Sequence, residues 1–370
     1  MINAPSNPTH KVTPPYQLEG QELPNGWTVG SIVEKRKGDT GGHHSVGYNC
    51  TSNTGEHFFL KAIDLYEPLQ KRGGNILKDL QIFIHEVQGE RDLLDQCRRM
   101  DRVVTVIDGG DIEELNGELL VIPIPYIIFE RAVGNARSVV FSTNRATHGW
   151  CLHTLHQVAV GLWQMHGSMI AHQDVKLSNV LLFDNRKGAK ISDLGRSVQQ
   201  GRSVPHDQML WPSDHSYAPP EFAYGYAIDE FNARRLAADL YLLGSCACSI
   251  FTGVSINGLL YDALHPDFRP RWQQGTYAGT FAEVLPHLKD AFERVIERVQ
   301  AAIPHNAPYR EDVVTMISEW CDPNPRERGH PLTRAINAKR GNIYSLERYL
   351  SKLANLATKA TIFDRALLSK

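Results

Sequence analysis

Four polar residues on two nearby stretches of the chain have types and spacing that suit a reaction centre. Asp174, Lys176 and Asn179 lie in one loop, and Asp193 follows a short apolar stretch further along the chain. This order places two carboxylates, a lysine and an amide on two loops that short apolar strands separate. Carboxylate and amide oxygens are ligands that Mg²⁺ prefers, and a carboxylate can receive a hydroxyl proton. The pattern indicates phosphoryl transfer assisted by a divalent metal ion.

The loop at residues 171–182, with the sequence AHQDVKLSNVLL, resembles the catalytic loop of protein kinases. Asp193 opens the triplet Asp-Leu-Gly, which resembles the family's Asp-Phe-Gly. The resemblance implies that Asp174 accepts the substrate's hydroxyl proton and that Lys176 neutralises charge on the γ-phosphate of ATP. It assigns Mg²⁺, with Mn²⁺ as a second candidate, to Asn179 and Asp193. The Asp-x-Lys order is similar to that of serine/threonine kinases.

The two residues before Asp174 carry separate expectations. His172 is expected to pack and hydrogen-bond beneath the loop rather than to transfer protons. Gln173 stands where many members of the family have an arginine that binds an activating phosphate, so the loop resembles the non-RD type. A neutral amide cannot form that charge-assisted pairing. We therefore expect activity that does not depend on a phosphate docking at Gln173.

Composition limits the class of protein. The chain has 370 residues, a net charge of −2 and a pI of about 6.8, so no overall field attracts nucleic acid, and direct nucleic-acid binding is not expected. The six cysteines show no CxxC pair, which favours a reducing compartment, the cytoplasm. The longest apolar stretch, residues 240–251, is too short to span a bilayer. Residues 1–25 lack the pattern of a signal peptide.

Upstream of the loop, alternating apolar residues predict strands at residues 27–33, 43–51 and 57–63. The third strand contains Phe58-Phe59-Leu60-Lys61, which resembles the family's V-A-I-K. The resemblance implies that Lys61 binds the α- and β-phosphates. Phe59 replaces the small alanine that lies against adenine, which puts the affinity or pose of the nucleotide in question.

The polar loop between the first two strands resembles the family's glycine-rich loop only in part. Aligning Val46 with the valine of G-x-G-x-x-G-x-V leaves Gly41 in register, and Gly42 could serve if the loop is longer. The resemblance assigns all three residues to the nucleotide. A plain hairpin loop is the alternative.

Residues 75–100 have helical periodicity, and this helix should supply an acid that pairs with Lys61. Glu86 and Glu90 lie on one face of it. Glu90 fits the family's distance to the next strand better, and Glu86 stays as the alternative. Further on, residues 126–132 resemble the interlobe hinge. The resemblance adds Glu130 and Ala132 of this hinge to the nucleotide contacts, and also Leu181, which follows the catalytic loop.

Three later motifs resemble the family's large lobe. Tyr217-Ala-Pro-Pro-Glu221 resembles the Ala-Pro-Glu that closes the activation segment, which here comprises residues 193–221. The hydroxyl expected three residues before Tyr217 is absent, and Ser213 or Ser216 could substitute for it. Asp239 resembles the buried residue that tethers the catalytic loop. In Asp-Pro-Asn-Pro-Arg326, the arginine is expected to pair with Glu221, with Arg328 as the less favoured partner.

Together these features predict an α+β, bilobal protein-kinase-like fold. The small lobe has an antiparallel sheet with one main helix, and the larger lobe is mainly helical. The expected division is a flexible arm at 1–25, a small lobe with hinge at 26–132, a large lobe at 133–330 and a basic helical extension at 331–370. The extension is expected to pack back on the large lobe, and docking of a partner on it is the alternative.

The function expected from the resemblance is that of an ATP- and Mg²⁺-dependent serine/threonine protein kinase that acts on protein substrates and can phosphorylate itself. Two other functions stay open. One is a pseudokinase that binds nucleotide and acts as a scaffold, which Phe59 and the altered glycine loop suggest. The other is a small-molecule kinase of the same fold, against which the Ala-Pro-Glu-like segment argues.

Overall fold

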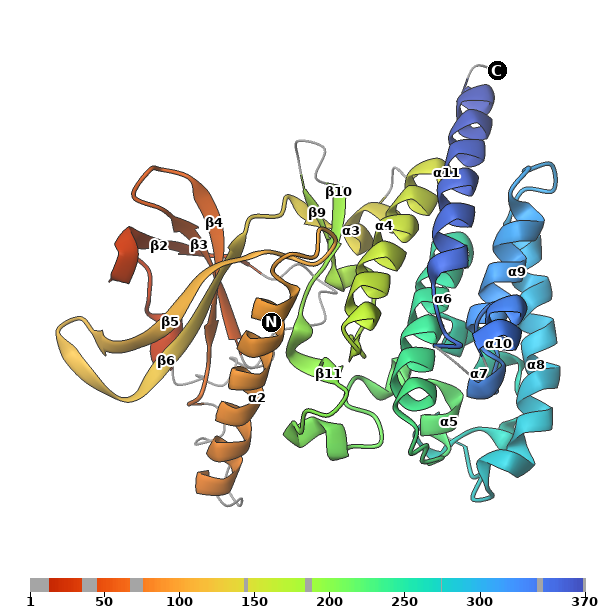
Figure 1. Ribbon diagram of the computed structural model, residues 1–370, viewed down its shortest axis with the longest axis horizontal. Coiled ribbons are helices and arrows are strands. Elements are labelled where there is room, and N and C mark those ends of the chain that lie inside the picture. Colours follow the sequence, from red (N-terminus) through yellow and green to blue (C-terminus); the bar gives the residue numbers. More distant parts are fainter. Residues whose placement is uncertain are drawn as a thin grey trace, which may run out of the picture. The chain divides into compact units, whose positions relative to one another are not determined.

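The computed structural model describes residues 13–34, 45–66, 76–142, 146–183, 188–273, 275–337 and 342–368. The chain forms two compact units: residues 1–91 with 105–131, and residues 92–104 with 132–370 (Figure 1). The first contains a sheet and most of one long helix, and the second is mainly helical. This confirms the expected α+β, bilobal kinase-like fold. The glycines expected over the phosphates, Gly41 and Gly42, lie outside the described residues.

The sheet of the first unit has six antiparallel strands in the order β1-β2-β3-β4-β6-β5. They are β1 (Glu22–Leu23), β2 (Trp27–Ile32), β3 (Ser45–Thr51), β4 (His57–Ile63), β5 (Val106–Leu115) and β6 (Glu118–Glu130). The predicted three-stranded meander corresponds to β2, β3 and β4. The last two strands, β5 and β6, form a long hairpin.

The two faces of this sheet have different partners because successive side chains of a strand point to opposite sides. Val46 pairs with Ala62 on one face, and Gly47 pairs with Lys61 on the other. The face of Val46 forms the unit's apolar core, which consists of Leu18, Leu23, Trp27, Val29, Val46, Tyr48, Cys50, Leu60, Ala62, Ile112, Leu115, Ile124, Tyr126 and Ile128. The face of Lys61 is the one that meets the long helix, through an ion pair described below.

Residues 13–25 are not the flexible arm that their prolines suggested. Leu18 is fully buried in the core of the first unit. The Thr13 hydroxyl donates to Asp64 over 2.8 Å, and the Tyr48 hydroxyl donates to the Pro15 carbonyl over 2.7 Å. The prolines therefore shape a covering segment that closes the apolar face of the sheet.

Helix α2 (Ile76–Cys97) supplies the helical part of the first unit, and its last turn, from Asp92, belongs to the second unit. Its buried positions follow helical spacing: Val87, Glu90, Leu93, Leu94 and Cys97. A carboxylate within this buried stripe requires a cationic partner.

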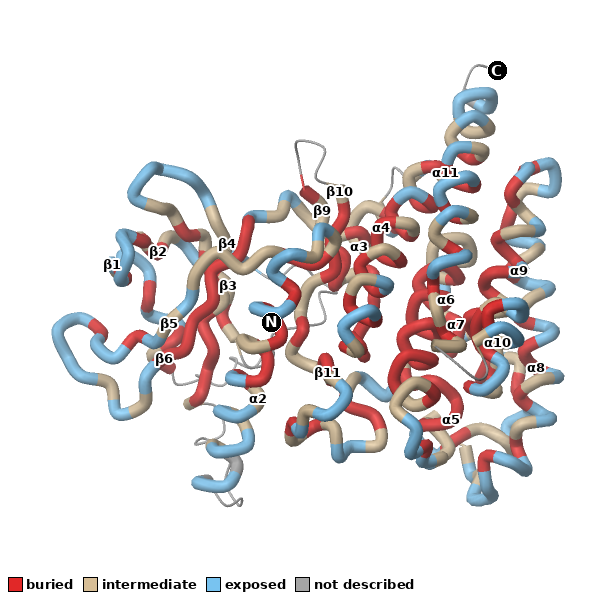
Figure 2. The backbone as a smooth tube through the Cα atoms, in the orientation of Figure 1, coloured by how far each residue is buried: buried red, intermediate tan, exposed pale blue. Residues whose placement is uncertain are grey.

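The second unit contains nine described helices labelled α, two short sheets and several single turns. The helices are α3 (Ala136–Val140), α4 (His148–Gly167), α5 (Pro220–Ala223), α6 (Ala237–Thr252), α7 (Ile256–Ala263), α8 (Phe281–Ala302), α9 (Arg310–Trp320), α10 (Pro331–Asn337) and α11 (Glu347–Leu368). Helix α6 is buried from Ala237 to Cys248 and forms the centre of the core (Figure 2).

Short strands of the second unit frame the two loops that carry the polar residues. They are β7 (Gly134–Asn135), β8 (Ile170–Ala171), β9 (Val180–Phe183), β10 (Gly188–Ile191) and β11 (Val198–Gln199). Strand β9 pairs with β7 and β10, and β8 pairs with β11. The catalytic-loop residues therefore run between β8 and β9, and Asp193 follows the end of β10.

The C-terminal helix α11 lies along α4 within the second unit (Figure 1). A Cβ on Gly149 of α4 would lie 2.8 Å from the Cα and the backbone nitrogen of Thr361 on α11, so only glycine fits there. The Asp364 carboxylate accepts the Gly149 N–H over 2.7 Å and thereby caps α4. Tyr349, Leu353 and Leu356 are buried, which confirms that this helix packs back on its own unit.

In the part of the chain that the structure describes, no single helix is long and apolar enough to cross a membrane. One bent pair, Asn232–Thr252 with Ile256–Ala263, meets that test by length and composition only, and most of α6 is buried in the protein core.

Candidate active site

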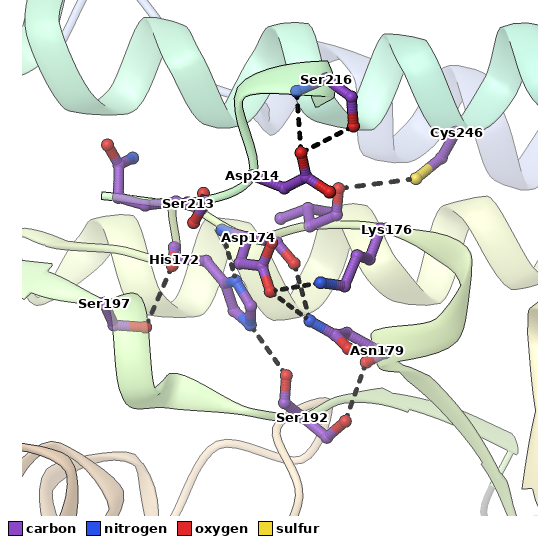
Figure 3. Close-up of polar contacts among 12 residues, drawn as sticks. His172, Asp174, Lys176, Asn179, Ser192, Ser197, Ser213, Asp214, Ser216 and Cys246 are labelled. Atoms are coloured by element: carbon purple, nitrogen blue, oxygen red, sulfur yellow. Dashed lines mark hydrogen bonds and ion pairs between the residues drawn. The ribbon is translucent and has the colours of Figure 1, made fainter. Parts of the chain in front are cut away.

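The catalytic loop brings three of the expected residues into contact. The Lys176 ammonium lies 2.8 Å from Oδ2 of Asp174, and the Asn179 amide nitrogen donates to the same oxygen over 2.9 Å (Figure 3). All three side chains are nearly buried. The carboxylate is thus held by two donors while its second oxygen, Oδ1, stays available to a substrate hydroxyl.

Asp174 has the electrostatic setting of a proton acceptor. Burial raises the pKa of its carboxyl, Lys176 opposes that shift, and the neighbouring charge of Asp193 adds to it. A carboxylate of raised pKa binds a proton more readily, which suits a general base.

Asn179 and Asp193 provide oxygen ligands that fit a magnesium ion. Both N–H bonds of the Asn179 amide are used, because Nδ2 donates to the carbonyl and to the carboxylate of Asp174, each over 2.9 Å. Its amide oxygen is left to accept. Ser192 donates twice to the Asn179 carbonyl, at 2.9 Å from its nitrogen and 3.0 Å from its hydroxyl, which brings Asp193 beside Asn179. Hard oxygen donors of this kind suit Mg²⁺. Among the described residues, no group of three His, Cys, Asp or Glu side chains forms a separate metal site.

His172 is a structural residue of the loop, as the sequence indicated. Its ring is fully buried, Nδ1 accepts the backbone N–H of Asp174 over 3.2 Å, and Nε2 lies 3.0 Å from the Ser192 carbonyl. These partners require a neutral ring protonated at Nε2. The ring therefore ties the catalytic loop to the strand end that carries the expected metal ligand.

Asp239, on α6, tethers the loop backbone as expected. Its two oxygens accept the N–H groups of His172 and Gln173 over 2.7 and 2.8 Å. The Nε2 atom of His166 lies 2.9 Å from the same carboxylate, and the whole group is buried. Because a buried carboxylate is stable only with such partners, these hydrogen bonds hold the loop against α6.

Gln173 adopts a left-handed backbone conformation with φ of 64° and is fully buried. Its side-chain nitrogen donates to the Arg235 carbonyl over 2.9 Å and to Asp239 over 3.1 Å, and its side-chain oxygen accepts from Arg235 over 3.1 Å. That activity does not depend on a phosphate docking at Gln173 stays a prediction, and the side-chain amide already has protein partners for its nitrogen and its oxygen. Arg235 was missed, although it lies one helical turn before Asp239 and so shares its face.

The activation segment touches the loop through a hydroxyl. Ser213 donates to the Gln173 carbonyl over 2.8 Å, whereas Ser216 donates to Asp214 over 2.8 Å. Of the two serines considered as substitutes for the missing hydroxyl, Ser213 is the one that contacts the catalytic loop (Figure 3).

In the first unit, the Lys61 ammonium lies 2.7 Å from Oε1 of Glu90, and Glu90 is nearly buried. The acid that the structure pairs with Lys61 is thus the favoured one, and the alternative, Glu86, is half-buried one turn earlier on α2. The pair fixes the direction of the ammonium, which a phosphate-binding lysine requires.

Phe59 and Gly47 lie on the Lys61 face of the sheet and fill each other's space. A Cβ on Gly47 would lie 2.8 Å from two ring carbons of Phe59, so the ring covers the glycine. Val46 is 4% exposed in the core on the opposite face, which contradicts its assignment to the nucleotide. The alignment that chose Val46 was offset by one residue, because Gly47, and not Val46, pairs with Lys61 on β4.

The remaining nucleotide candidates occupy ends of strands. Glu130 ends β6 with its carboxylate accepting the Thr105 N–H over 2.8 Å, so its side chain is turned inward. Leu181 is half-buried on β9, opposite Asn135. Ala132 is half-buried and opens the main part of the second unit.

The expected pairing of Glu221 with Arg326 is wrong. Arg328 forms the pair, with its two terminal nitrogens 2.7 and 2.6 Å from the two carboxylate oxygens. Both side chains are fully buried, whereas Arg326 is exposed. Arg328 also donates to the Asp322 carbonyl over 2.8 Å and lies 4.8 Å from the ring centre of Tyr241. These extra partners decide the choice, and sequence spacing does not reveal them.

Comparison with known proteins agrees with this geometry. Residues 38–331 match the family described as Protein kinase domain. The chain is similar to CTD kinase subunit alpha of Saccharomyces cerevisiae, with 29% identity over 31% of this chain and 22% of the relative. It is similar to G protein-coupled receptor kinase 2 of Caenorhabditis elegans, with 23% identity over 65% of this chain and 30% of the relative.

A third relative is serine/threonine-protein kinase SBK1 of Danio rerio, with 24% identity over 52% of this chain and 53% of the relative. The chain spans 22 to 53% of the length of these three curated relatives.

Proposed function

Because the chain belongs to the protein kinase family, we propose that it is an active enzyme that transfers the γ-phosphate of ATP to serine and threonine hydroxyls of proteins, with Mg²⁺ as its metal. One observation carries this proposal: the buried Asp174 carboxylate is held by Lys176 and Asn179 and has a raised pKa. Burying a carboxylate and an ammonium costs stability, and a catalytically inactive protein of this fold would gain nothing from that cost.

In the proposed reaction, Oδ1 of Asp174 accepts a hydrogen bond from the substrate hydroxyl, aims it at the γ-phosphorus and receives its proton. Lys176, 2.8 Å from Oδ2, lies where its charge can offset the charge of the transferring phosphoryl group. Asn179 and Asp193 would hold Mg²⁺, which supplies neutralisation of the phosphate charge. Lys61, aimed by Glu90, would bind the α- and β-phosphates.

Two features support a serine or threonine side chain of a protein as the acceptor. The Asp-x-Lys order of Asp174 and Lys176 resembles that of serine/threonine kinases. The buried pair of Glu221 and Arg328 supports a full activation segment, which kinases acting on small molecules generally lack.

The scaffold hypothesis depended on Phe59 crowding the base. Because Gly47 leaves room for the Phe59 ring on the same face of the sheet, the aromatic residue and the glycine compensate each other in volume. This observation favours a nucleotide-binding face over a blocked one.

We also propose that the enzyme lies in the cytoplasm. All six cysteines are free thiols and buried, and a reducing compartment keeps them so. Fractionation of the source cells with an antibody would test this placement.

The test of the function is transfer of label from γ-labelled ATP, with Mg²⁺, to the protein itself and to generic protein acceptors. Wild type should yield labelled phosphoserine or phosphothreonine after acid hydrolysis, and Asp174→Ala and Asp193→Ala should not. A thermal shift with Mg·ATP but no label on any acceptor would contradict the proposal and favour a scaffold. Label only on small alcohols would indicate a small-molecule kinase.

A further inference from the structure

The turn that precedes α6 is a π-helical turn, Asn232–Leu236, and such turns often lie at functional sites. It places Arg235 in the interior with no exposed surface. Nη1 of this guanidinium donates to the side-chain oxygen of Gln173 over 3.1 Å, and the Gln173 amide donates back to the Arg235 carbonyl over 2.9 Å. The two residues are thus joined in both directions, directly before the catalytic Asp174.

The other end of the guanidinium reaches the activation segment. Nη2 of Arg235 donates to Oδ1 of Asp207 over 2.9 Å and to the Asp207 carbonyl over 3.0 Å. The neighbouring Arg234 donates to the same carbonyl over 2.8 Å and to the Met209 carbonyl over 2.9 Å. Two arginines of one turn therefore hold residues 207–209 against the π-helical turn that also contacts the catalytic loop.

We propose that Arg235 is a positioning residue of the reaction: it joins Gln173 to Asp207, so that a permanent carboxylate, rather than a phosphate, holds the activation segment and sets the catalytic loop. This inference rests on the proposed kinase activity. It identifies the side chain that meets Arg235 in place of an added phosphate group.

Charge explains why Asp207 matters. The pKa of Arg235 is lowered to about 10, by burial first and then by the nearby charge of Arg234, while Asp207 and Asp239 oppose these two effects. Asp239 already accepts two backbone N–H groups of the loop. Neutralising Asp207 would leave the buried guanidinium short of negative charge, so the turn or the segment must rearrange to hydrate it.

Backbone geometry explains why the rearrangement would reach the reaction. Gln173 has a positive φ of 64°. Residues other than glycine rarely adopt this backbone conformation unless the surrounding structure holds them in it. Arg235, Asp239 and Ser213 are those neighbours. Loosening one of them lets Gln173 relax, and Asp174 is the next residue along the chain. Small displacements of a catalytic base cost rate rather than binding.

The test compares Asp207→Asn and the conservative Asp207→Glu with Asp290→Asn, which removes an Arg–Asp pair on α8 of the same unit. Asp207→Asn should lower kcat about tenfold while the KM for ATP stays within about twofold, and Asp207→Glu should recover much of the rate. Asp290→Asn should match wild type. Wild type treated with a protein phosphatase should keep its activity.

Amide hydrogen exchange over residues 197–213 provides the arm that needs no activity. Asp207→Asn should exchange faster there than wild type, and Asp290→Asn should not. Unchanged kcat and exchange in Asp207→Asn, or loss of activity after dephosphorylation, would overturn the proposal. If wild type transfers no phosphate at all, the kinase proposal fails. Faster exchange confined to Asp207→Asn would then still establish that the contact between Arg235 and Asp207 holds the activation segment.

Discussion

Replacing Arg328 with methionine should strongly destabilise the second unit. The guanidinium makes two bonds to Glu221, at 2.7 and 2.6 Å, and both side chains are fully buried, so the variant strands a carboxylate in the core. Breaking a buried pair in this way costs about 3–5 kcal/mol. For a unit of this size, about 2–4 °C of melting temperature is lost per kcal/mol, so the midpoint should fall by about 6–20 °C. Thermal and urea unfolding of the two purified proteins measure the loss.

Arg326→Met is the matched control, because Arg326 lies two residues away and is exposed. It should unfold within about 2 °C of wild type, since surface substitutions rarely exceed about 0.5 kcal/mol. The double variant Glu221→Gln with Arg328→Met should lose less than the sum of the single losses, because neither charge is then left alone. A stable Arg328→Met, or an Arg326→Met that is equally damaged, would refute the pairing.

Three further predictions concern the site. Lys176 opposes the burial that raises the pKa of Asp174, so Lys176→Met should move the acid limb of the kcat–pH profile to higher pH; an unmoved or lowered limb would contradict this electrostatic account. The pKa of Asp174 is raised in the folded state, so the wild-type protein loses stability as pH rises through that pKa. Asp174→Asn should therefore melt at a higher temperature than wild type at neutral pH, and the difference in melting temperature should disappear in acid. A lower melting temperature of Asp174→Asn at neutral pH would contradict this prediction. Gly47→Val should displace the Phe59 ring and weaken ATP binding about tenfold, whereas Gly47→Val with Phe59→Ala should return to within about threefold of wild type; a double variant weaker than Gly47→Val would show that the two residues do not compensate.

Much of the fold could be predicted from the periodicity of hydrophobic residues along the sequence. Alternation located β2, β3 and β4, and helical spacing located α2. The N-terminal segment was misjudged because its prolines suggest an unpacked arm. In the structure, Leu18 packs in the core of the first unit and the Pro15 carbonyl accepts a hydrogen bond from Tyr48. The sequence alone does not show that this face of the sheet needs a covering segment.

At the site, local spacing was a good guide where neighbours in sequence are neighbours in space. Asp174, Lys176 and Asn179 meet because they share one loop. Spacing gave no help where the partner comes from another element. Arg328 was passed over for Arg326 because burial, not motif position, decides which guanidinium reaches Glu221.

The register of β3 against β4 was the other feature that the sequence did not predict correctly. A shift of one residue exchanges the two faces of a strand, and an imperfect glycine loop left that shift undetected. Val46 therefore stood where Gly47 belongs, on the face of Lys61. Pairing against β4 settles the choice, and this information exists only once the sheet is formed.

The most direct measurement is the steady-state rate of phosphate transfer to a protein acceptor by wild type and Asp174→Asn, at saturating Mg·ATP. Asp174 receives the hydroxyl proton in this account, so its amide variant should fold, bind ATP like wild type and transfer phosphate at least about 100-fold more slowly. Asp290→Asn should transfer at the wild-type rate. An Asp174→Asn protein as fast as wild type, or a wild type that binds Mg·ATP and transfers nothing, would contradict the account.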